Sequence, residues 1–185
     1  MVLMLERKKI MNPIKLNLGC ANDIKEGYIN VDLFHNDPRV KLADVRKLDF
    51  VESNTAEEVY AKDILEHITF TDGHEALKEW HRVLKPGGRL YVQTINFDLQ
   101  VEAFQRGFWS LADYNYMLFA GPGWVDDYSR PQDFHKSVYT VPYMTKLLES
   151  LGFVIEESKT DRIDQQLMHM PRSHNLNMKI WARKQ

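Results

Sequence analysis

The stretch IKLNLGCANDIKEGYINVD, from Ile14 to Asp32, contains two apolar runs separated by a tight turn of small residues. The first run ends at Gly19, and the second ends in an acid, Asp32. Short apolar runs bounded by glycine and polar residues are typical of buried strands. An acid just beyond such a turn is typical of a ligand site at the end of a strand. The stretch therefore predicts an α/β fold and a binding site at one edge of its sheet.

The spacing of glycine in this turn argues against a dinucleotide ligand. A dinucleotide site uses Gly-x-Gly-x-x-Gly, with an acid about twenty residues further on. Here the turn has one glycine, Gly19, and Asp32 follows it by only thirteen positions. The missing glycines are those that let a pyrophosphate approach the backbone, so a ligand with a diphosphate is disfavoured. A nucleoside without phosphate remains compatible with the turn.

Short strand-like runs alternate with helical patterns along the chain, which indicates a parallel sheet flanked by helices. Two runs near the C-terminal end, FVIEESK and LNMKIWARK, are expected to close the sheet. The five strands expected before them are Ile14–Gly19, Tyr28–Asp32, Val40–Asp44, Glu57–Ala61 and Arg89–Ile95.

Two helices have recognisable ends. Thr71 is expected to cap the first, and Pro86-Gly87-Gly88 to end it. Thr140 is expected to cap the second, which Gly152 ends. The apolar residues at helical spacing are Ala76, Leu77, Trp80, Val83 and Leu84 in the first helix, and Met144, Leu147, Leu148 and Leu151 in the second.

The regular pattern breaks down between Asn96 and Tyr139. Two weak helices are expected there, at Leu99–Arg106 and Trp109–Phe119. Long irregular segments are uncommon in compact domains and are usually functional or disordered. The aromatic residues of this segment favour a function, and we interpret residues 96–139 as an insertion that covers the substrate.

The composition restricts the class of protein. The 24 lysines and arginines nearly balance 26 aspartates and glutamates, so the net charge of −2 gives no overall attraction to nucleic acid or anionic lipid. The single cysteine, Cys20, cannot form an internal disulfide, and the Cys/His spacing of a zinc site does not occur. We expect one cytoplasmic domain over residues 14–185, after an N-terminal extension, 1–13, in which Met11 is an alternative start.

Several pieces of the sequence occur together in a known family. They are LNLGCAND, NVD, LADV, VYAKDILEHI, ALKEWHRVLKPGGRLYV and LLESLGFVIEE. In this order they resemble the class I S-adenosylmethionine-dependent methyltransferases, in particular the small ones that act on metabolites or glycans. The resemblance implies an α/β, Rossmann-like seven-stranded sheet, mostly parallel with the last strand antiparallel and with helices on both faces. It also implies S-adenosylmethionine as the cofactor.

The resemblance implies roles for individual residues around that cofactor. Asp32 would accept hydrogen bonds from both ribose hydroxyls, and Asp44 with Val45 would reach the adenine. Gly19 and Cys20 would line the turn beside the methionine part. The other positions implied for the cofactor are Asn17, Ala21, Leu33, Ala61 and Lys62, with the last two beneath the methyl group.

Some of these positions leave alternatives open. Asp32 and Asp44 could instead cap the turns that follow their strands, as aspartate commonly does. Ala21 stands where the family usually has a second glycine, which narrows the approach to the backbone. Asn17 stands where an acid often holds the ammonium group of the cofactor, so an acceptor is kept while a charge is lost.

The insertion lies where the family builds its substrate cover. The candidates for the substrate site are Trp124, Tyr128, Asp133, Phe134 and Tyr139. Aromatic walls with a few polar groups suit a sugar ring or a small polar metabolite, and the alternative is a loop that packs its aromatics against the sheet. His135 is the candidate general base for a hydroxyl acceptor, because histidine titrates near neutral pH. The alternative for His135 is a surface or packing position.

No metal is expected, because the acid pairs Asp126-Asp127 and Asp161/Asp164 lack the arrangement of a magnesium site. Glu66 and His67 match a recurrent Leu-Glu-His of the family and are expected to be structural.

These features favour O-methylation of a small molecule or of a sugar or glycan precursor, in polysaccharide biosynthesis. The N-methylation motif Asn/Asp-Pro-Pro-Tyr/Phe is absent from the sequence. Two other functions stay open. The chain could bind S-adenosylmethionine as a non-catalytic partner subunit, or it could methylate RNA or protein, although the near-neutral charge disfavours RNA.

Overall fold

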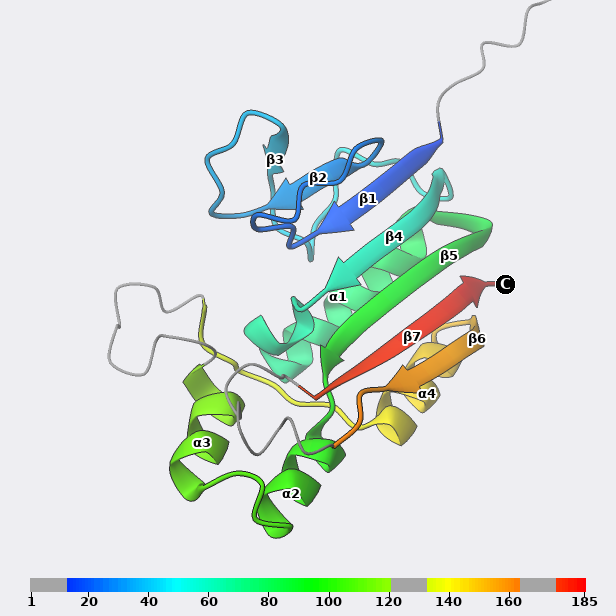
Figure 1. Ribbon diagram of the computed structural model, residues 1–185. Coiled ribbons are helices and arrows are strands. Elements are labelled where there is room, and N and C mark those ends of the chain that lie inside the picture. Colours follow the sequence, from blue (N-terminus) through cyan, green and yellow to red (C-terminus); the bar gives the residue numbers. More distant parts are fainter. Residues whose placement is uncertain (1–12, 121–132, 164–175) are drawn as a thin grey trace, which may run out of the picture.

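Seven strands form one sheet (Figure 1). The computed structural model describes residues 13–120, 133–163 and 176–185. In chain order the strands are β1 Ile14–Leu18, β2 Ile29–Asp32, β3 Val40–Leu42, β4 Ala56–Lys62, β5 Leu84–Ile95, β6 Phe153–Thr160 and β7 Asn177–Lys184. Each strand expected from an apolar run is therefore present.

The order of strands across the sheet is β3-β2-β1-β4-β5-β7-β6. The pairs from β3 to β5 are parallel, whereas β7 runs antiparallel to both β5 and β6. This confirms the expected, mostly parallel sheet with an antiparallel last strand. The order reverses between β1 and β4, and ligands of open α/β sheets bind at such a reversal, outside the carboxyl ends of the strands.

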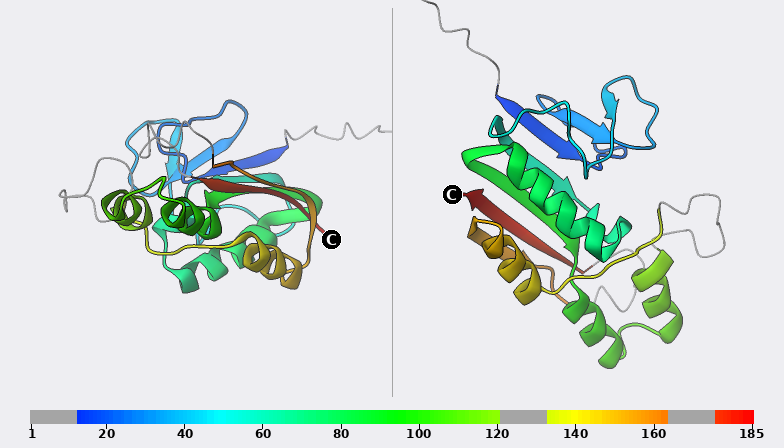
Figure 2. Two further views of the ribbon diagram at one scale, coloured as in Figure 1. Left: turned by 60° about the horizontal axis from the view of Figure 1, so that its bottom comes forward. Right: turned by 180° about the vertical axis from the view of Figure 1, so that it is seen from behind.

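Two helices, α1 (Phe70–Val83) and α4 (Val141–Ser150), cover the same face of the sheet, which Figure 2 shows from behind. The apolar sides of the helices and the inward side chains of the strands form one core, which includes Trp80 of α1, Leu148 of α4 and Leu90 of β5. The resemblance implied helices on both faces. Among the described residues, however, the helices that pack on the sheet lie on only one of its faces.

The opposite face carries a row of aromatic side chains, because residues that alternate with the core positions point away from it. The rings of Tyr60 and Tyr91 stack with their centroids 4.6 Å apart, and Trp181 lies 4.7 Å from Tyr91. The guanidinium of Arg89 lies over Trp181, and the ammonium of Lys25 lies over Tyr60. Stacking and cation–π contacts therefore cover the middle of this face.

The ends of α1 differ from the sequence prediction. Its N-cap is Thr69 rather than Thr71, because the Thr69 hydroxyl accepts a hydrogen bond from the backbone N–H of Asp72 at 3.2 Å. The helix ends at Val83, and Pro86-Gly87-Gly88 lies in the irregular start of β5, where the register against β4 shifts. The ends of α4 are as expected, since its N-cap residue accepts a hydrogen bond from the backbone and the glycine after the helix has a positive φ.

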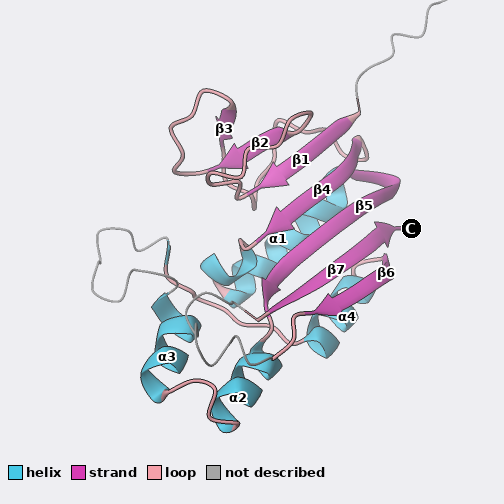
Figure 3. Ribbon diagram, in the orientation of Figure 1, coloured by secondary structure: helices cyan, strands magenta, loops and turns pink. Residues whose placement is uncertain are grey.

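Short helical segments follow β5 and lie beyond its carboxyl end (Figure 3). They are α2 Phe97–Gln105, α3 Leu111–Asn115, and the π-helical turn η2 Tyr116–Ala120. Both weak helices expected in this region are therefore present. The second begins later than expected, because Ser110 and Asp113 form a capping box that leaves Trp109 buried outside the helix.

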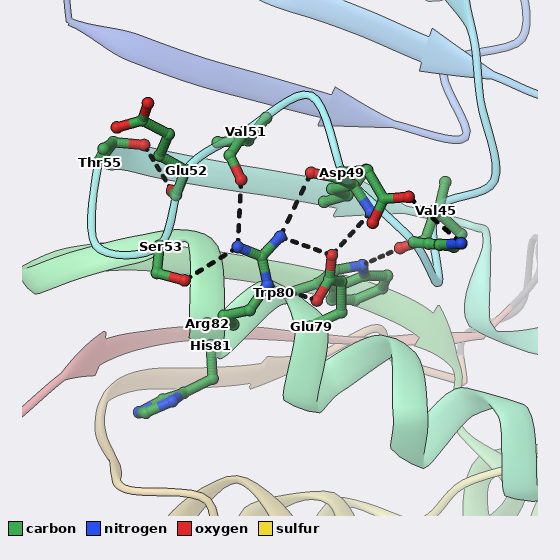
Figure 4. Close-up of polar contacts among 12 residues, drawn as sticks. Val45, Asp49, Val51, Glu52, Ser53, Thr55, Glu79, Trp80, His81 and Arg82 are labelled. Atoms are coloured by element: carbon green, nitrogen blue, oxygen red, sulfur yellow. Dashed lines mark hydrogen bonds and ion pairs between the residues drawn. The ribbon is translucent and has the colours of Figure 1, made fainter.

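The connection between β3 and β4, residues 43–55, is fastened to α1 by polar contacts (Figure 4). The indole Nε1 of Trp80 donates to the backbone oxygen of Val45 at 2.9 Å. Arg82, two residues further along α1, donates to Glu79 and to backbone oxygens of the connection. These contacts fix the backbone at Val45, which lies in the wall of the cavity described below.

Trp80→Phe is expected to lower the free energy of unfolding by about 1–3 kcal/mol more than Trp109→Phe, because it leaves the buried oxygen of Val45 without a donor. Trp109 is a matched control. Its indole is also buried, but its Nε1 has no partner among the described residues, so Trp109→Phe removes the same part of a ring and breaks no hydrogen bond. Urea denaturation measures both losses. Equal losses would mean that ring volume, and not this hydrogen bond, holds the connection.

Candidate functional site

A cavity of about 440 Å³ opens at the carboxyl ends of β1, β2 and β4. Its volume is within the usual range for small-molecule sites. The walls come from the loops that follow the first four strands and from the start of α1. The cofactor positions implied by the resemblance that line it are Gly19, Ala21, Asp32, Leu33, Asp44 and Val45.

The turn after β1 borders the cavity in a conformation that favours glycine. Gly19 has a φ of +63°, and a Cβ built on it would lie 2.7 Å from side-chain carbons of Ile64. Ala21 also has a positive φ, +40°, which is unusual for a residue with a side chain. The N–H of Ala21 donates to Asp32 Oδ2 at 3.0 Å. The turn is therefore held close to both Ile64 and the acid at the end of β2.

Asp32 fastens two turns and also faces the cavity. Its Oδ2 accepts from the N–H of Ala21, and its Oδ1 accepts from the N–H of Phe34 at 2.9 Å. Each carboxylate oxygen can accept a further hydrogen bond. Two neighbouring ribose hydroxyls fit such a pair of acceptors. Turn capping and ligand binding, which the sequence presented as alternatives for Asp32, are therefore compatible.

One end of the cavity is built around Asp44, which follows β3. Arg46 donates to both oxygens of its carboxylate, with an Nη2–Oδ2 distance of 2.6 Å, and also to Asp72 of α1 at 2.9 Å. The hydrogen bonds from Arg46 hold the pKa of Asp44 below its ordinary value. Asp44 is therefore an ionised acceptor beside Val45, where an exocyclic amine can reach it.

The other end of the cavity lies at the end of β4. Asp63, which has a φ of +53°, accepts at Oδ1 from Gln93 Nε2 at 2.9 Å and from Asn177 Nδ2 at 3.5 Å. Burial raises the pKa of the Asp63 carboxyl. Ile64 and His67 follow in the same wall. A residue in an uncommon backbone conformation with a perturbed pKa is typical of functional sites.

A buried acid lies behind this wall. Glu66 is 1% exposed and accepts from the hydroxyl of Thr94 at 2.8 Å. Burial first, and the charge of Asp63 second, raise the pKa of Glu66 to about 8. The backbone oxygen of Glu66 accepts from the N–H of Lys136 at 2.6 Å. Glu66 thus fastens the segment that brings Asp133 and Lys136 into the cavity wall.

His135, the general base predicted from the sequence, lies outside the cavity wall. Its ring is 5.0 Å from that of His67, measured between centroids, and its Nδ1 contacts the backbone oxygen of Met117 at 3.0 Å. Burial, with a smaller effect of His67, lowers the pKa of His135 to about 4, which makes it a weak base. The histidine that lines the cavity is His67, which the sequence indicated as structural, and burial lowers its pKa as well.

Asn17 lies beneath the turn and does not line the cavity. Its amide donates to the backbone oxygen of Asp23 at 2.7 Å and to the side-chain oxygen of Asn30 at 2.8 Å. Because these contacts occupy its amide hydrogens, Asn17 stabilises the turn. An uncharged residue suits this position, because Asn17 is buried and donates a hydrogen bond to the neighbouring amide of Asn30.

Three other cofactor positions also lie outside the wall. Cys20 is buried, and burial raises the pKa of its thiol to about 11, so it is a small packing residue. Ala61 faces the core on the side of α1. Lys62 alternates with it and points to the opposite face of the sheet, half-buried. The residue that meets the cavity here is instead the next one in the chain, Asp63, which directly follows β4.

Of the predicted substrate residues too, some line the cavity and others do not. Asp133 lines the cavity. Tyr139 is 1% exposed, packs in the core against Gly73 of α1 and does not line the cavity. Trp124 and Tyr128 lie outside the described residues.

The sequence analysis missed Asp63, Arg46 and Asp72. Asp63 had a usable signal, because it lies two positions after the expected strand Glu57–Ala61 and the carboxyl ends of parallel strands meet at one edge. Arg46 and Asp72 had none, since their contact joins a loop to a helix 26 residues away.

Within residues 13–120, 133–163 and 176–185, no group of three or more His, Cys, Asp or Glu side chains is placed to hold a metal ion. In the same part of the chain, the helices are too short or too polar to cross a membrane.

Comparisons with known proteins give one family model for part of the chain and many solved structures of the same fold. Residues 18–92 match a family model described as a methyltransferase domain. A search of curated proteins gives no match. Among solved structures, an S-adenosylmethionine-dependent methyltransferase of Methanosarcina mazei is 15% identical, with a TM-score of 0.64 over 99% of this chain and 98% of its own.

Two further structures have the same fold. An S-adenosylmethionine-dependent methyltransferase of Mesorhizobium loti is 19% identical, with a TM-score of 0.56 over 92% of this chain and 90% of its own. The 1,6-didemethyltoxoflavin-N1-methyltransferase of Burkholderia thailandensis was solved with 1,6-didemethyltoxoflavin and S-adenosylhomocysteine bound. It is 17% identical, with a TM-score of 0.59 over 94% of this chain and 72% of its own.

The matched segment contains Gly19, Asp32 and Asp44, which line the cavity at the reversal of strand order. The likeness of fold extends over nearly the whole chain. Residues 18–92 therefore match a methyltransferase-domain model, and the chain has the fold of S-adenosylmethionine-dependent methyltransferases of known structure.

Proposed function

We propose that the protein transfers the methyl group of S-adenosylmethionine to a hydroxyl of a small sugar or glycan precursor, in polysaccharide biosynthesis. The observation that carries the proposal is the order of side chains along the cavity. Asp44, Asp32, Gly19 and Asp63 follow β3, β2, β1 and β4, which is also the order of these strands in the sheet. Neighbouring strands are about 4.8 Å apart, so these groups form a row suited to an elongated ligand.

Each part of the row has a role toward the cofactor. The carboxylate of Asp44 accepts from the adenine amine, and that of Asp32 accepts from the ribose hydroxyls. The backbone at Gly19 borders the methionine part. When bound, S-adenosylmethionine supplies a methyl carbon activated by a positively charged sulfur. The protein then has to align the nucleophile and exclude water.

The far end of the cavity supports a polar acceptor. Asp63, His67, Asp133 and Lys136 supply charged and hydrogen-bonding groups there, and Ile64 adds an apolar surface. A few polar groups on an apolar wall suit a sugar, which has hydroxyls at its rim and C–H groups on its faces. The fold alone does not determine the methylated atom, since the Burkholderia enzyme is named for methylation of a nitrogen.

The test is a screen of acceptors with the full chain, read out by release of S-adenosylhomocysteine and by the mass of the product. The panel contains sugars, sugar nucleotides, small amines and RNA oligonucleotides. We expect release above the acceptor-free rate with sugars or sugar nucleotides, and a product heavier by one methyl group. Asp32→Ala, tested at the same concentration, is the control for contaminating activity.

Two results would contradict the proposal at different levels. Methylation of an amine or an RNA, with none of the sugars, would overturn the proposed acceptor. No heat in calorimetry together with no thermal shift, from S-adenosylmethionine or S-adenosylhomocysteine at millimolar ligand, would overturn the proposed methyl transfer, because a ligand that binds the folded state raises its stability.

A further inference from the structure

We propose that Asp63 is the catalytic residue that hydrogen-bonds the methyl acceptor and takes the proton of its nucleophilic hydroxyl. This inference rests on the proposed function, because it assumes that the cofactor lies along the row from Asp44 to the end of β4. Asp63 is the carboxylate of the cavity wall that directly follows β4.

Asp63 is held by one oxygen and leaves the other available. Tyr91 donates to Gln93 Oε1 at 2.9 Å, which fixes the side-chain amide so that its Nε2 faces Asp63 Oδ1. Asn177 donates to the same oxygen from β7 at 3.5 Å. Oδ2 accepts no hydrogen bond from the described residues. A carboxylate gripped in this way has a fixed direction and a vacant acceptor.

The charges around Asp63 suit a proton acceptor better than those around Asp44. Arg46 neutralises Asp44 and lowers its pKa, whereas the groups that hold Asp63 are neutral amides. Among the charged neighbours, Lys62 and Lys179 lower the pKa of Asp63 and Asp161 raises it, while Lys179 is paired with Asp161 at 2.6 Å. Burial raises the pKa of Asp63, and a carboxylate with a raised pKa is a stronger base.

The place of Asp63 in the row puts it beside the reacting carbon. With the adenine at Asp44 and the ribose at Asp32, the rest of the cofactor extends past β1 toward β4. Ile64 packs directly against Gly19, so the residue before it borders the same space. The φ of +53° at Asp63, fixed by a bond from its N–H to the oxygen of Gln93 at 2.9 Å, is an uncommon conformation of the kind that occurs at active sites.

The chemistry balances without a further reactant. The hydroxyl oxygen of the acceptor forms a bond to the methyl carbon while the bond from that carbon to sulfur breaks. The electron pair of the broken bond stays on sulfur, which becomes a neutral thioether. The proton of the hydroxyl moves to Oδ2 of Asp63 and is later released to solvent.

A different role for Asp63 has to be separated from this one. The methionine part of the cofactor carries an ammonium group, and a carboxylate near Gly19 could bind that group instead of the acceptor. The two roles differ in which ligand atoms Asp63 faces, so they can be separated by ligands that differ only at the position of the methyl group.

The experiment compares two ligands and needs no acceptor. S-Adenosylhomocysteine lacks the methyl group, and sinefungin carries an amine in its place, which is protonated near pH 7. Both contain the same amino-acid end. Calorimetry gives the ratio of their Kd values for the wild type and for Asp63→Asn, which keeps the acceptor for Gln93 and suits a positive φ. We expect sinefungin to lose at least about tenfold in affinity relative to S-adenosylhomocysteine in the variant, as for one hydrogen bond to a charged group.

The matched control is Asp161→Asn, which removes the same charge from the neighbourhood of Asp63 but is not in the cavity wall. We expect the ratio of Kd values to stay within about twofold of the wild type, since Asp161 is paired with Lys179 and its charge is screened outside the cavity wall. If Asp63→Asn does not fold, Asp63→Gly removes the carboxylate in a residue that adopts the same φ.

Three results would overturn the inference. Equal weakening of both ligands would assign Asp63 to the ammonium of the methionine part. Unchanged affinity for both would remove it from the site. Failure of the wild type to bind either ligand would instead refute the proposed function, and the inference with it, so the two failures are distinguishable.

Discussion

Gly19→Ala is expected to lower the free energy of unfolding by about 2–5 kcal/mol and to weaken binding of S-adenosylhomocysteine more than tenfold. A side chain at a φ of +63° costs about 1–2 kcal/mol. The new Cβ would also lie 2.7–2.8 Å from three carbons of Ile64, including its Cβ, which cannot rotate away. Relief of such overpacking costs about 1–3 kcal/mol more and moves the turn that borders the cofactor.

The two costs can be measured separately. Gly27 also has a positive φ, +78°, but a Cβ there meets no atom within 4 Å. Gly27→Ala is therefore expected to show the conformational cost alone and to leave the affinity unchanged. Ile64→Ala combined with Gly19→Ala should destabilise the protein less than the sum of the single changes, because truncation of Ile64 removes two of the three close carbons and the new methyl group fills part of the space left. Urea denaturation and calorimetry measure both effects.

A result in which Gly19→Ala and Gly27→Ala are equally destabilising would contradict the close contact with Ile64. A folded Gly19→Ala variant with unchanged affinity would mean that the turn after β1 does not border the cofactor. In that case Gly19 would not belong to the row of groups, from Asp44 to Asp63, on which the proposed function depends.

The strands and the positions at their carboxyl ends follow from local sequence because both depend on the same signal. A parallel strand is buried on both faces, so it appears as an apolar run, and its end is marked by the first polar residue or glycine. Gly19, Asp32 and Asp44 are such residues, and sheet topology alone brings them to one edge. The prediction of these positions required no knowledge of side-chain contacts.

The remaining errors arise where neighbouring residues compete for one role. Thr69 and Thr71 are both suitable caps, and the structure uses the one whose hydroxyl reaches the N–H of Asp72. His67 and His135 are 5.0 Å apart, and which of them lines the cavity depends on the path of the backbone through Glu66 and Lys136. Spacing in the sequence contains no information on such contacts.

Lys62 and Asp63 illustrate the limit most directly. They are adjacent in the sequence, and the resemblance implied a role for the first. The alternation of β4 turns Lys62 to the outer face of the sheet, and the positive φ at Asp63 then directs the chain into the cavity wall. A backbone conformation that is uncommon for aspartate, and absent from any periodic pattern, decided which of the two residues meets the cavity.

Asp32→Ala is expected to weaken binding of S-adenosylhomocysteine by about 1.5–3 kcal/mol, or roughly 10–150-fold in Kd, the usual size for hydrogen bonds to a charged group. The carboxylate lies in the cavity wall with each oxygen already fixed by one backbone N–H, from Ala21 and from Phe34. Because the carboxylate is already fixed, binding a ligand costs it no further side-chain entropy. A large fraction of the energy of the new hydrogen bonds should therefore appear as affinity.

The matched control for this change is Asp37→Ala. Asp37 belongs to the same loop after β2, and its carboxylate also accepts from a backbone N–H two residues later, that of Arg39, but it is not in the cavity wall. We expect the affinity of this variant to stay within about twofold of the wild type, since its ion pair with Arg39 is exposed. Calorimetry with both variants, after thermal melting has verified that they fold, separates the two roles of Asp32. Equal affinities would assign its carboxylate to the turns alone, and the ribose would then need another acceptor in the cavity.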